Sequence, residues 1–334
     1  MQKTNQQIDA EKQAFKEKIL SYGLLYKCIT GSRLYGTFRP DSDIDIRGVF
    51  IAPPEYYYGF LNKVETIETK SPDETFWELR QFMSLALANN HQILELLFTP
   101  TSHIISSSDT WETIKKNRDL FLSTRVIRTF SGYAASQLHR IKQHREWLLH
   151  PISRQPSRTD FGLPDNQSLV TKDQLNAFSG LQTHLGADLE TAFHIDTNFI
   201  EILHREKAYQ NALHHWNEYQ DWKKNRNPIR HDLEAEFGYD TKHAAHLVRL
   251  VEEGMELLTT KQITFPRPES DELRRIINGV YSYDVLMEKY GDIDKLFQDI
   301  QDRIVLPQSP NAEAVDQLCC ELSAREICRR QVKK

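Results

Sequence analysis

Two short segments near the start of the chain have the residue types for phosphoryl chemistry. Gly31-Ser32 ends a short apolar run, and ten residues later come Asp43 and Asp45, each followed by an isoleucine. A glycine where a strand ends lets backbone N–H groups approach phosphate oxygens closely, and the serine hydroxyl adds a donor. Two carboxylates two residues apart on a strand leave the same face, so they could hold divalent cations together.

A pair of divalent cations on one rigid edge suits the transfer of a phosphoryl or nucleotidyl group. Such a pair contacts the attacking and the leaving oxygen and stabilises the charge that develops there. Mg²⁺ suits this role because it takes few protein oxygens and shares phosphate oxygens and water. We therefore expect two Mg²⁺ ions, with Mn²⁺ as the alternative, and a nucleoside triphosphate (NTP) such as ATP as the substrate.

A third acidic side chain should complete the metal site or accept the proton of the incoming hydroxyl. It is expected from one of the next strands. Asp73 is the first candidate because it starts the segment that leads into Thr75–Trp77, and Glu74 and Glu78 are the alternatives. Which of the three side chains faces Asp43 and Asp45 stays open at this point.

Short strands must position these residues. Apolar and alternating segments predict strands at 24–30, 44–51, 64–69 and 75–77. In the second of these, Ile44 and Ile46 should point into the core. Helical spacing of apolar residues follows over 8–22, 78–97, 120–149, 174–222, 241–259 and 313–330.

These elements predict an α+β protein with a small mixed sheet followed by a larger helical part. At roughly 150 residues per domain, 334 residues indicate about two domains. We expect a catalytic domain over 1–100 and a helical domain over 101–334 that contacts the nucleotide and the acceptor. The segment 150–173, rich in proline and glycine, is predicted as a long loop.

Composition excludes several classes of protein. The formal net charge is −5, which excludes a basic coat for polyanions over the whole surface. Four cysteines without a CxxC pair predict reduced thiols in a cytoplasmic protein rather than a zinc site or a disulfide framework. No apolar run approaches the roughly 20 residues of a membrane helix, and the polar start is unlike a signal peptide.

The glycine, serine and aspartate pattern resembles the signature of the DNA polymerase β nucleotidyltransferase superfamily. More narrowly, the chain is similar to a family of predicted nucleotidyltransferases of bacteria and phages, some associated with RNA repair ligases. The segments that carry this resemblance are GSRLYGT (31–37), DSDIDIRGVF (41–50), ELRQFMSLALANN (78–90), RTDFGLP (158–164) and GYDTKHAAHLVRL (238–250).

The resemblance implies roles for individual residues. Ser32 would contact the triphosphate beside Gly31, and Asp43 and Asp45 would hold two magnesium ions. The third acid transfers to Asp73 less directly, since Glu74 and Glu78 lie close by. Apart from the resemblance, we expect Arg33 to neutralise the β and γ phosphates. The resemblance does not supply the acceptor, for which we expect RNA, either tRNA or a damaged RNA end.

Two basic features could add ligand contacts. Lys242, His246 and Arg249 fall on one helical face and could bind the triphosphate or the acceptor backbone, although an ordinary solvated face is equally consistent. Between Lys115 and Arg158 there are ten Lys or Arg residues against two acids, a composition suited to nucleic acid.

Other functions stay open from sequence alone. The acceptor could be a protein side chain, which would make the protein an AMP transferase or a toxin–antitoxin type of nucleotidyltransferase. A non-enzymatic nucleotide or RNA-binding module is a further alternative. Arg226-Asn227 with His231 has the spacing of a helical ribonuclease, but Pro228 interrupts it and favours chance.

Overall fold

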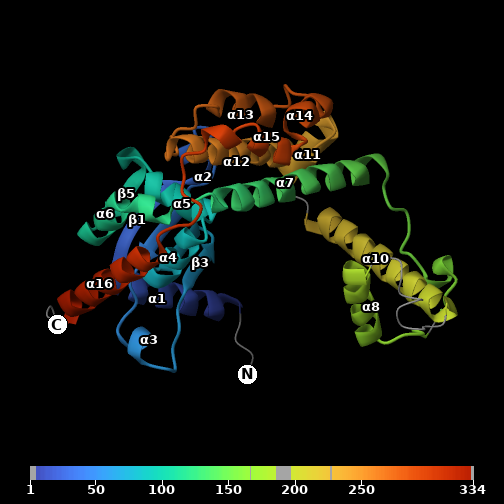
Figure 1. Cartoon of the computed structure of the whole chain (residues 1–334), viewed down its shortest axis with the longest axis horizontal. Coiled ribbons are helices and arrows are strands. Elements are labelled where there is room, and N and C mark those ends of the chain that lie inside the picture. Colours follow the sequence, from blue (N-terminus) through green and yellow to red (C-terminus); the bar gives the residue numbers. More distant parts are fainter. Residues whose placement is uncertain (1–4, 166, 186–196, 226–227, 332–334) are drawn as a thin grey trace. The chain divides into compact units, whose positions relative to one another are not determined.

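The computed structural model describes residues 5–165, 167–185, 197–225 and 228–331 (Figure 1). Its sheet has five strands: β1 (Leu24–Thr30), β2 (Asp45–Phe50), β3 (Thr66–Lys70), β4 (Asp73–Glu78) and β5 (Ile104–Ser107). They lie in the order β3-β4-β2-β1-β5. The β2–β4 pair is parallel and the other pairs are antiparallel, which confirms the predicted mixed sheet.

The parallel pairing brings the starts of β2 and β4 to the same edge of the sheet. Ile46 lies opposite Glu74 in this register, so Asp45 and Asp73 begin neighbouring strands. Strand β1 runs antiparallel to β2, and its last residue, Thr30, pairs with Asp45. The end of β1 and the starts of β2 and β4 therefore meet.

Helices cover both faces of this sheet. On one face, Ile19 of α1 (Asn5–Gly23) packs with Ile46, Phe50 and Phe76. On the other, the ring of Tyr26 stacks on Trp111 of α6 at 3.9 Å between centroids. Residues that alternate along each strand thus enter two different apolar layers.

The remaining helical elements confirm that the region after the sheet is largely helical. They are α2 (Gly31–Tyr35), α3 (Glu55–Tyr58), α4 (Leu79–Leu87), α5 (His91–Phe98), η1 (Thr101–His103), α6 (Asp109–Lys116), η2 (Arg118–Phe121), α7 (Arg125–Leu149), η3 (Arg158–Phe161), α8 (Lys172–Leu185), α10 (Thr197–Asn225), α11 (Pro228–Phe237), α12 (Thr241–Thr260), α13 (Ser270–Ile277), α14 (Tyr283–Tyr290), α15 (Ile293–Gln298), η4 (Gln301–Arg303) and α16 (Ala312–Gln331). Figure 1 shows α12–α15 grouped together.

The chain divides into two compact units, and this division differs from the predicted boundary near residue 100. The first unit combines 1–141 with 241–334, and the second is 142–240. The helices after 241 join the first unit because they pack on its early helices. Thr110 of α6 donates to Glu326 of α16 at 2.5 Å, and Gly254 of α12 packs against Phe130 of α7.

The structure differs from the predicted elements in three places. The helix over 78–97 is broken at Asn89, which has φ +55 and donates through its side chain to the Phe121 carbonyl at 2.6 Å. Strand β5 was not predicted because its sequence, IISS, is short and half polar. The predicted loop 150–173 contains η3, where Ser157 and Asp160 form a capping box.

Within the described ranges, no helix is long and apolar enough to cross a membrane. The four cysteines carry free thiols, as their number and spacing predicted.

Candidate active site

Strand β1 delivers Gly31 to a position that only glycine can occupy without strain. Gly31 has φ +66, in the left-handed region, and begins the short helix α2. A Cβ built at this position would lie 1.8 Å from Oδ2 of Asp45. The carboxylate of Asp45 therefore lies directly against the backbone of the glycine, as close as the glycine allows.

Three carboxylates gather at this edge. Burial raises the pKa of Asp45 to about 6, and a side-chain hydrogen bond with Asp73 and the charges of Asp73 and Asp43 also raise it, while Arg47 lowers it. Asp43 is exposed and precedes the strand, whereas Asp45 is half-buried. The negative charges of these carboxylates repel one another, and a cation beside them would relieve that repulsion.

Arg47 supplies part of this positive charge. The sequence analysis did not identify this residue. Its Nη1 lies 3.0 Å from Oδ1 of Asp73 and also donates to the Ile46 carbonyl at 2.8 Å. The signal was present in the sequence, since Arg47 follows Asp45 by two residues and so shares its face of the strand.

Glu74 and Glu78 lie on the other face of β4 and have their own partners. The carboxylate of Glu74 forms ion pairs with Lys16 and, at 3.3 Å, with Lys27. Glu78 caps α4 by accepting from the Arg80 backbone N–H at 2.9 Å and also accepts from the Tyr57 hydroxyl. These contacts favour Asp73 over the two glutamates as the third acid.

Ile44 does not point into the core, contrary to its prediction. The side chain is 50% exposed, while Ile46 is buried. The physical reason is that β2 begins at Asp45, so Ile44 belongs to the preceding loop and has no sheet face to cover it. Asp43 and Ile44 both sit on this loop, which joins α2 to β2.

Ser32 and Arg33 follow Gly31 in α2. Ser32 is half-buried, and its hydroxyl makes no hydrogen bond to any residue that the structure describes. Arg33 donates through Nη2 to the Ser42 carbonyl at 3.2 Å and lies over the ring of Phe38 at 5.4 Å. Arg33 therefore holds the 36–44 loop that leads to the acids.

Arg249 does not present its charge to a nucleotide, which corrects the sequence expectation. It is 5% exposed and forms ion pairs with Glu95 at 2.6 Å and Glu253 at 2.7 Å. Its guanidinium covers the ring of Tyr35 at 4.1 Å, and the Tyr35 hydroxyl donates to Glu95 at 2.7 Å. Arg249 thus supports α2 from the protein interior.

The other two residues of that face are placed differently from Arg249. Lys242 is half-buried and His246 is exposed on α12. A contact of either with the triphosphate stays a prediction. Of the ribonuclease-like residues, Arg226 and Asn227 lie outside the described residues, and the side chain of His231 is exposed.

The segment after α12 and helix α13 also contact the end of α2. The Arg267 backbone N–H donates to the Tyr35 carbonyl at 3.2 Å, and Arg274 donates to the Gly36 carbonyl. Gly36 has φ +79, and a Cβ there would approach Pro266 to 3.0 Å. The site is therefore built from the sheet edge and from the α12–α13 connection together.

Comparison with known proteins agrees with this architecture. Residues 2–151 match the model of a family described as RlaP, RNA repair pathway DNA polymerase beta family. This match confirms, over that part of the chain, the resemblance read from the motifs. The description suggests nucleotidyl transfer, the chemistry of the polymerase β superfamily.

Two curated relatives match shorter segments. An uncharacterized 38.9 kDa protein in the nrdC-mobD intergenic region of Enterobacteria phage T4 is 30% identical over 123 residues, 33% of this chain and 36% of the phage protein. The uncharacterized protein YcgL of Bacillus subtilis (strain 168) is 33% identical over 82 residues, 23% of this chain and 32% of that protein. The chain thus spans about a third of the length of the curated relatives it matches.

Proposed function

We propose that this protein is a metal-dependent nucleotidyltransferase that transfers a nucleoside monophosphate from an NTP to a hydroxyl of an RNA acceptor and releases pyrophosphate. The observation that carries the proposal is the gathering of Asp43, Asp45 and Asp73 beside Gly31 at one sheet edge. The family matched by residues 2–151 supports the same chemistry and the RNA acceptor.

The donor set fits a divalent metal. Three carboxylates at one sheet edge supply the hard oxygen ligands that Mg²⁺ or Mn²⁺ takes, and Arg47 is the cation that the structure pairs with Asp73. Asp43, Asp45 and Asp73 would hold two such ions. When bound, the ions would supply positive charge to the transferring phosphoryl group.

The protein's own residues position the substrates in this proposal. Gly31 leaves room for the Asp45 carboxylate, and Arg47 holds the carboxylate of Asp73 at 3.0 Å. The Ser32 hydroxyl and the backbone around Gly31 would donate to the β and γ phosphates. Arg33, as the nearest cation on α2, would add charge on the same side.

The proposed reaction is an in-line displacement. The acceptor oxygen forms a bond to the α-phosphorus, and the bond from the α-phosphorus to the oxygen that bridges to the β-phosphate breaks. Pyrophosphate leaves with the electron pair of that bond. The proton of the attacking hydroxyl passes to the carboxylate of Asp73.

The test is incorporation of label from the α-phosphate of each NTP into separate pools of RNA, DNA and protein. We expect label in RNA with stoichiometric release of pyrophosphate, and we expect Asp43→Ala with Asp45→Ala to abolish both while the thermal unfolding midpoint stays near that of the wild type. Label in protein or DNA alone would overturn the RNA acceptor. Full activity of the double variant would overturn the site.

A further inference from the structure

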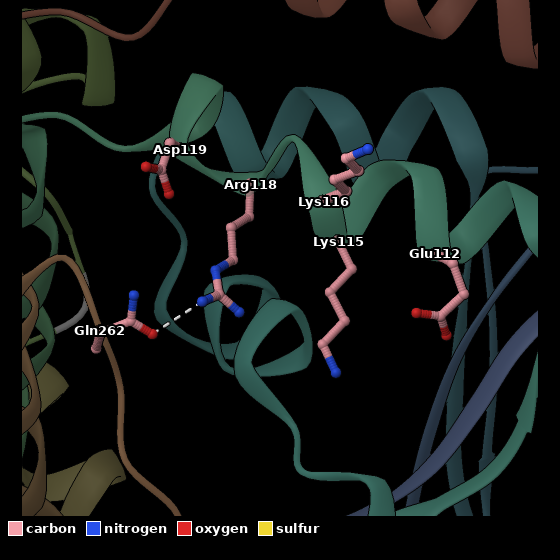
Figure 2. A pocket seen from close by; sticks show the side chains of 6 residues that line it. All are labelled: Glu112, Lys115, Lys116, Arg118, Asp119 and Gln262. Atoms are coloured by element: carbon pink, nitrogen blue, oxygen red, sulfur yellow. Dashed lines mark hydrogen bonds between the residues drawn. The ribbon is translucent and has the colours of Figure 1, made fainter.

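A polar cavity lies in the first unit, and its lining does not include the residues of the carboxylate cluster. It has a volume of about 450 Å³ and is lined by Glu112, Lys115, Lys116, Arg118, Asp119 and Gln262. These residues come from α6, η2 and the segment that follows α12. Figure 2 shows Lys115 and Arg118 extending to the same side, with Gln262 facing Arg118, while Lys116 extends the other way.

Lys115 and Arg118, which extend to the same side, both contact neutral groups. Arg118 lies over the ring of Phe98 at 4.5 Å and donates to Oε1 of Gln262 at 2.9 Å. Lys115 donates to the Thr99 carbonyl at 3.1 Å. Among the residues that the structure describes, neither Lys115 nor Arg118 forms an ion pair, so their charges stay available to an anion.

The lining contains three cations, Lys115, Lys116 and Arg118, against two acids, Glu112 and Asp119. Glu112 accepts a hydrogen bond from the Ser107 hydroxyl at 2.5 Å, and Asp119 is exposed at the start of η2. A fixed guanidinium fork, an ammonium group and an amide are together the donors that bind phosphate oxygens. In a chain of net charge −5, such a local donor set selects for anions.

Both walls of the cavity continue into segments that touch α2. Thr99, which Lys115 contacts, leads into η1, where Nε2 of His103 lies 3.3 Å from the Arg33 carbonyl oxygen. Gln262 leads to Arg267, whose N–H bonds the Tyr35 carbonyl. The cavity is thereby tied to the helix that carries Ser32.

We propose that this pocket binds a backbone phosphate of the acceptor RNA strand, an inference that rests on the proposed function. A free phosphate offers the same chemistry, so the experiment must separate the two sources. Lys115 is also the first residue of the basic run that ends at Arg158 in the sequence.

The experiment compares two variants of the full chain that lose the same charge. Lys115→Gln with Arg118→Gln alters the pocket, and Lys12→Gln with Lys18→Gln alters exposed lysines on α1. Affinity for a fluorescein-labelled single-stranded RNA 12-mer is measured by anisotropy across KCl concentrations. Binding of ATP with Mg²⁺ and of inorganic phosphate is measured by calorimetry.

We expect the pocket variant to bind RNA on the order of tenfold more weakly and to lower the slope of log K against log salt by about 0.7, the value for one phosphate contact with a single strand. The α1 variant should keep the wild-type slope, and ATP binding should be unchanged in both. An equal loss in the two variants, or a loss of inorganic phosphate binding with unchanged RNA affinity, overturns the proposal.

Failure of the pocket and failure of the proposed function give different results. If the wild type transfers label to RNA and the pocket variant has the same KM for RNA, the pocket proposal fails and the function stands. If the pocket variant loses RNA affinity as expected but the wild type transfers no nucleotide, the pocket stands and the proposed function fails.

Discussion

At the scale of single residues, the account depends on how closely Gly31 and Asp45 approach each other. Their spacing in the sequence predicts that a glycine turn and a carboxylate pair lie together, and the structure places Oδ2 of Asp45 where a Cβ of residue 31 would be. The contact between Asp45 and Asp73 could not be derived in the same way. It depends on the parallel register of β2 and β4, which no local pattern encodes.

Gly31→Ala should therefore impair catalysis more than folding. Alanine at φ +66 costs about 1–2 kcal/mol, and its Cβ must displace the Asp45 carboxylate. A displacement of about 1 Å is expected to lower the rate of nucleotide transfer roughly 100-fold. The test measures two quantities for the variant and the wild type: the rate of nucleotide transfer, and the free energy of unfolding from urea titration.

Gly132→Ala is the matched control for that substitution. A Cβ at Gly132, in helix α7, meets nothing within 4 Å. The control should raise helix stability by up to about 1 kcal/mol and leave the transfer rate unchanged. A Gly31→Ala variant with the wild-type transfer rate would contradict the contact between Gly31 and Asp45 as a catalytic requirement.

At the scale of elements, a buried ionic cluster joins α12, α5 and α2. Arg249 of α12 contacts Glu95 of α5 and Glu253 one turn farther along its own helix, and it covers Tyr35 of α2. The helical period predicted the extent of α12 correctly. The burial of Arg249 could not be predicted, because its partner Glu95 is 154 positions away in the sequence.

This cluster predicts how stability depends on pH. Burial and the nearby charge of Glu95 together raise the pKa of the Glu253 carboxyl to about 8, although Arg249 and Arg267 oppose the rise. The folded state therefore holds this proton more tightly than the unfolded state, whose pKa is near 4.5. The resulting stabilisation is complete below about pH 4.5 and is lost as the pH rises toward 8.

Glu253→Gln removes that proton and with it this part of the pH dependence. Between pH 5 and 8 the wild type should lose up to about 1.4 kcal/mol of unfolding free energy per pH unit relative to the variant. Urea unfolding of both proteins at pH 5, 6, 7 and 8 measures the difference. Parallel curves for the two proteins would show that Glu253 titrates alike in the folded and unfolded states.

At the scale of the whole molecule, the chain has two units, but their boundaries are not where composition and secondary structure suggest. Hydrophobic periodicity identifies helices after residue 241 without showing that they pack with residues before 141. Buried pairs such as Thr110 with Glu326 make that connection across more than 200 residues. The first unit thereby assembles the sheet edge, α2 and the α12–α13 connection.

The net charge of the whole chain also does not show how charge is distributed along the sequence. The net charge of −5 excludes a basic coat, yet ten Lys or Arg residues lie between Lys115 and Arg158. The sequence analysis predicted this run as a contact for nucleic acid. The structure adds a cavity at its start, lined by Lys115, Arg118 and Gln262 among others.

The most direct test of the catalytic site compares two neighbouring acids on opposite faces of β4. Asp73→Asn removes a carboxylate that contacts Asp45 and Arg47, whereas Glu74→Gln removes one that pairs with Lys16 and Lys27. Transfer of α-labelled nucleotide to RNA is measured at a temperature below the thermal unfolding midpoint of both variants. We predict that Asp73→Asn loses on the order of 100-fold or more in rate with little change in stability, while Glu74→Gln keeps its rate and loses stability. An Asp73→Asn variant that transfers nucleotide at the wild-type rate would contradict the account.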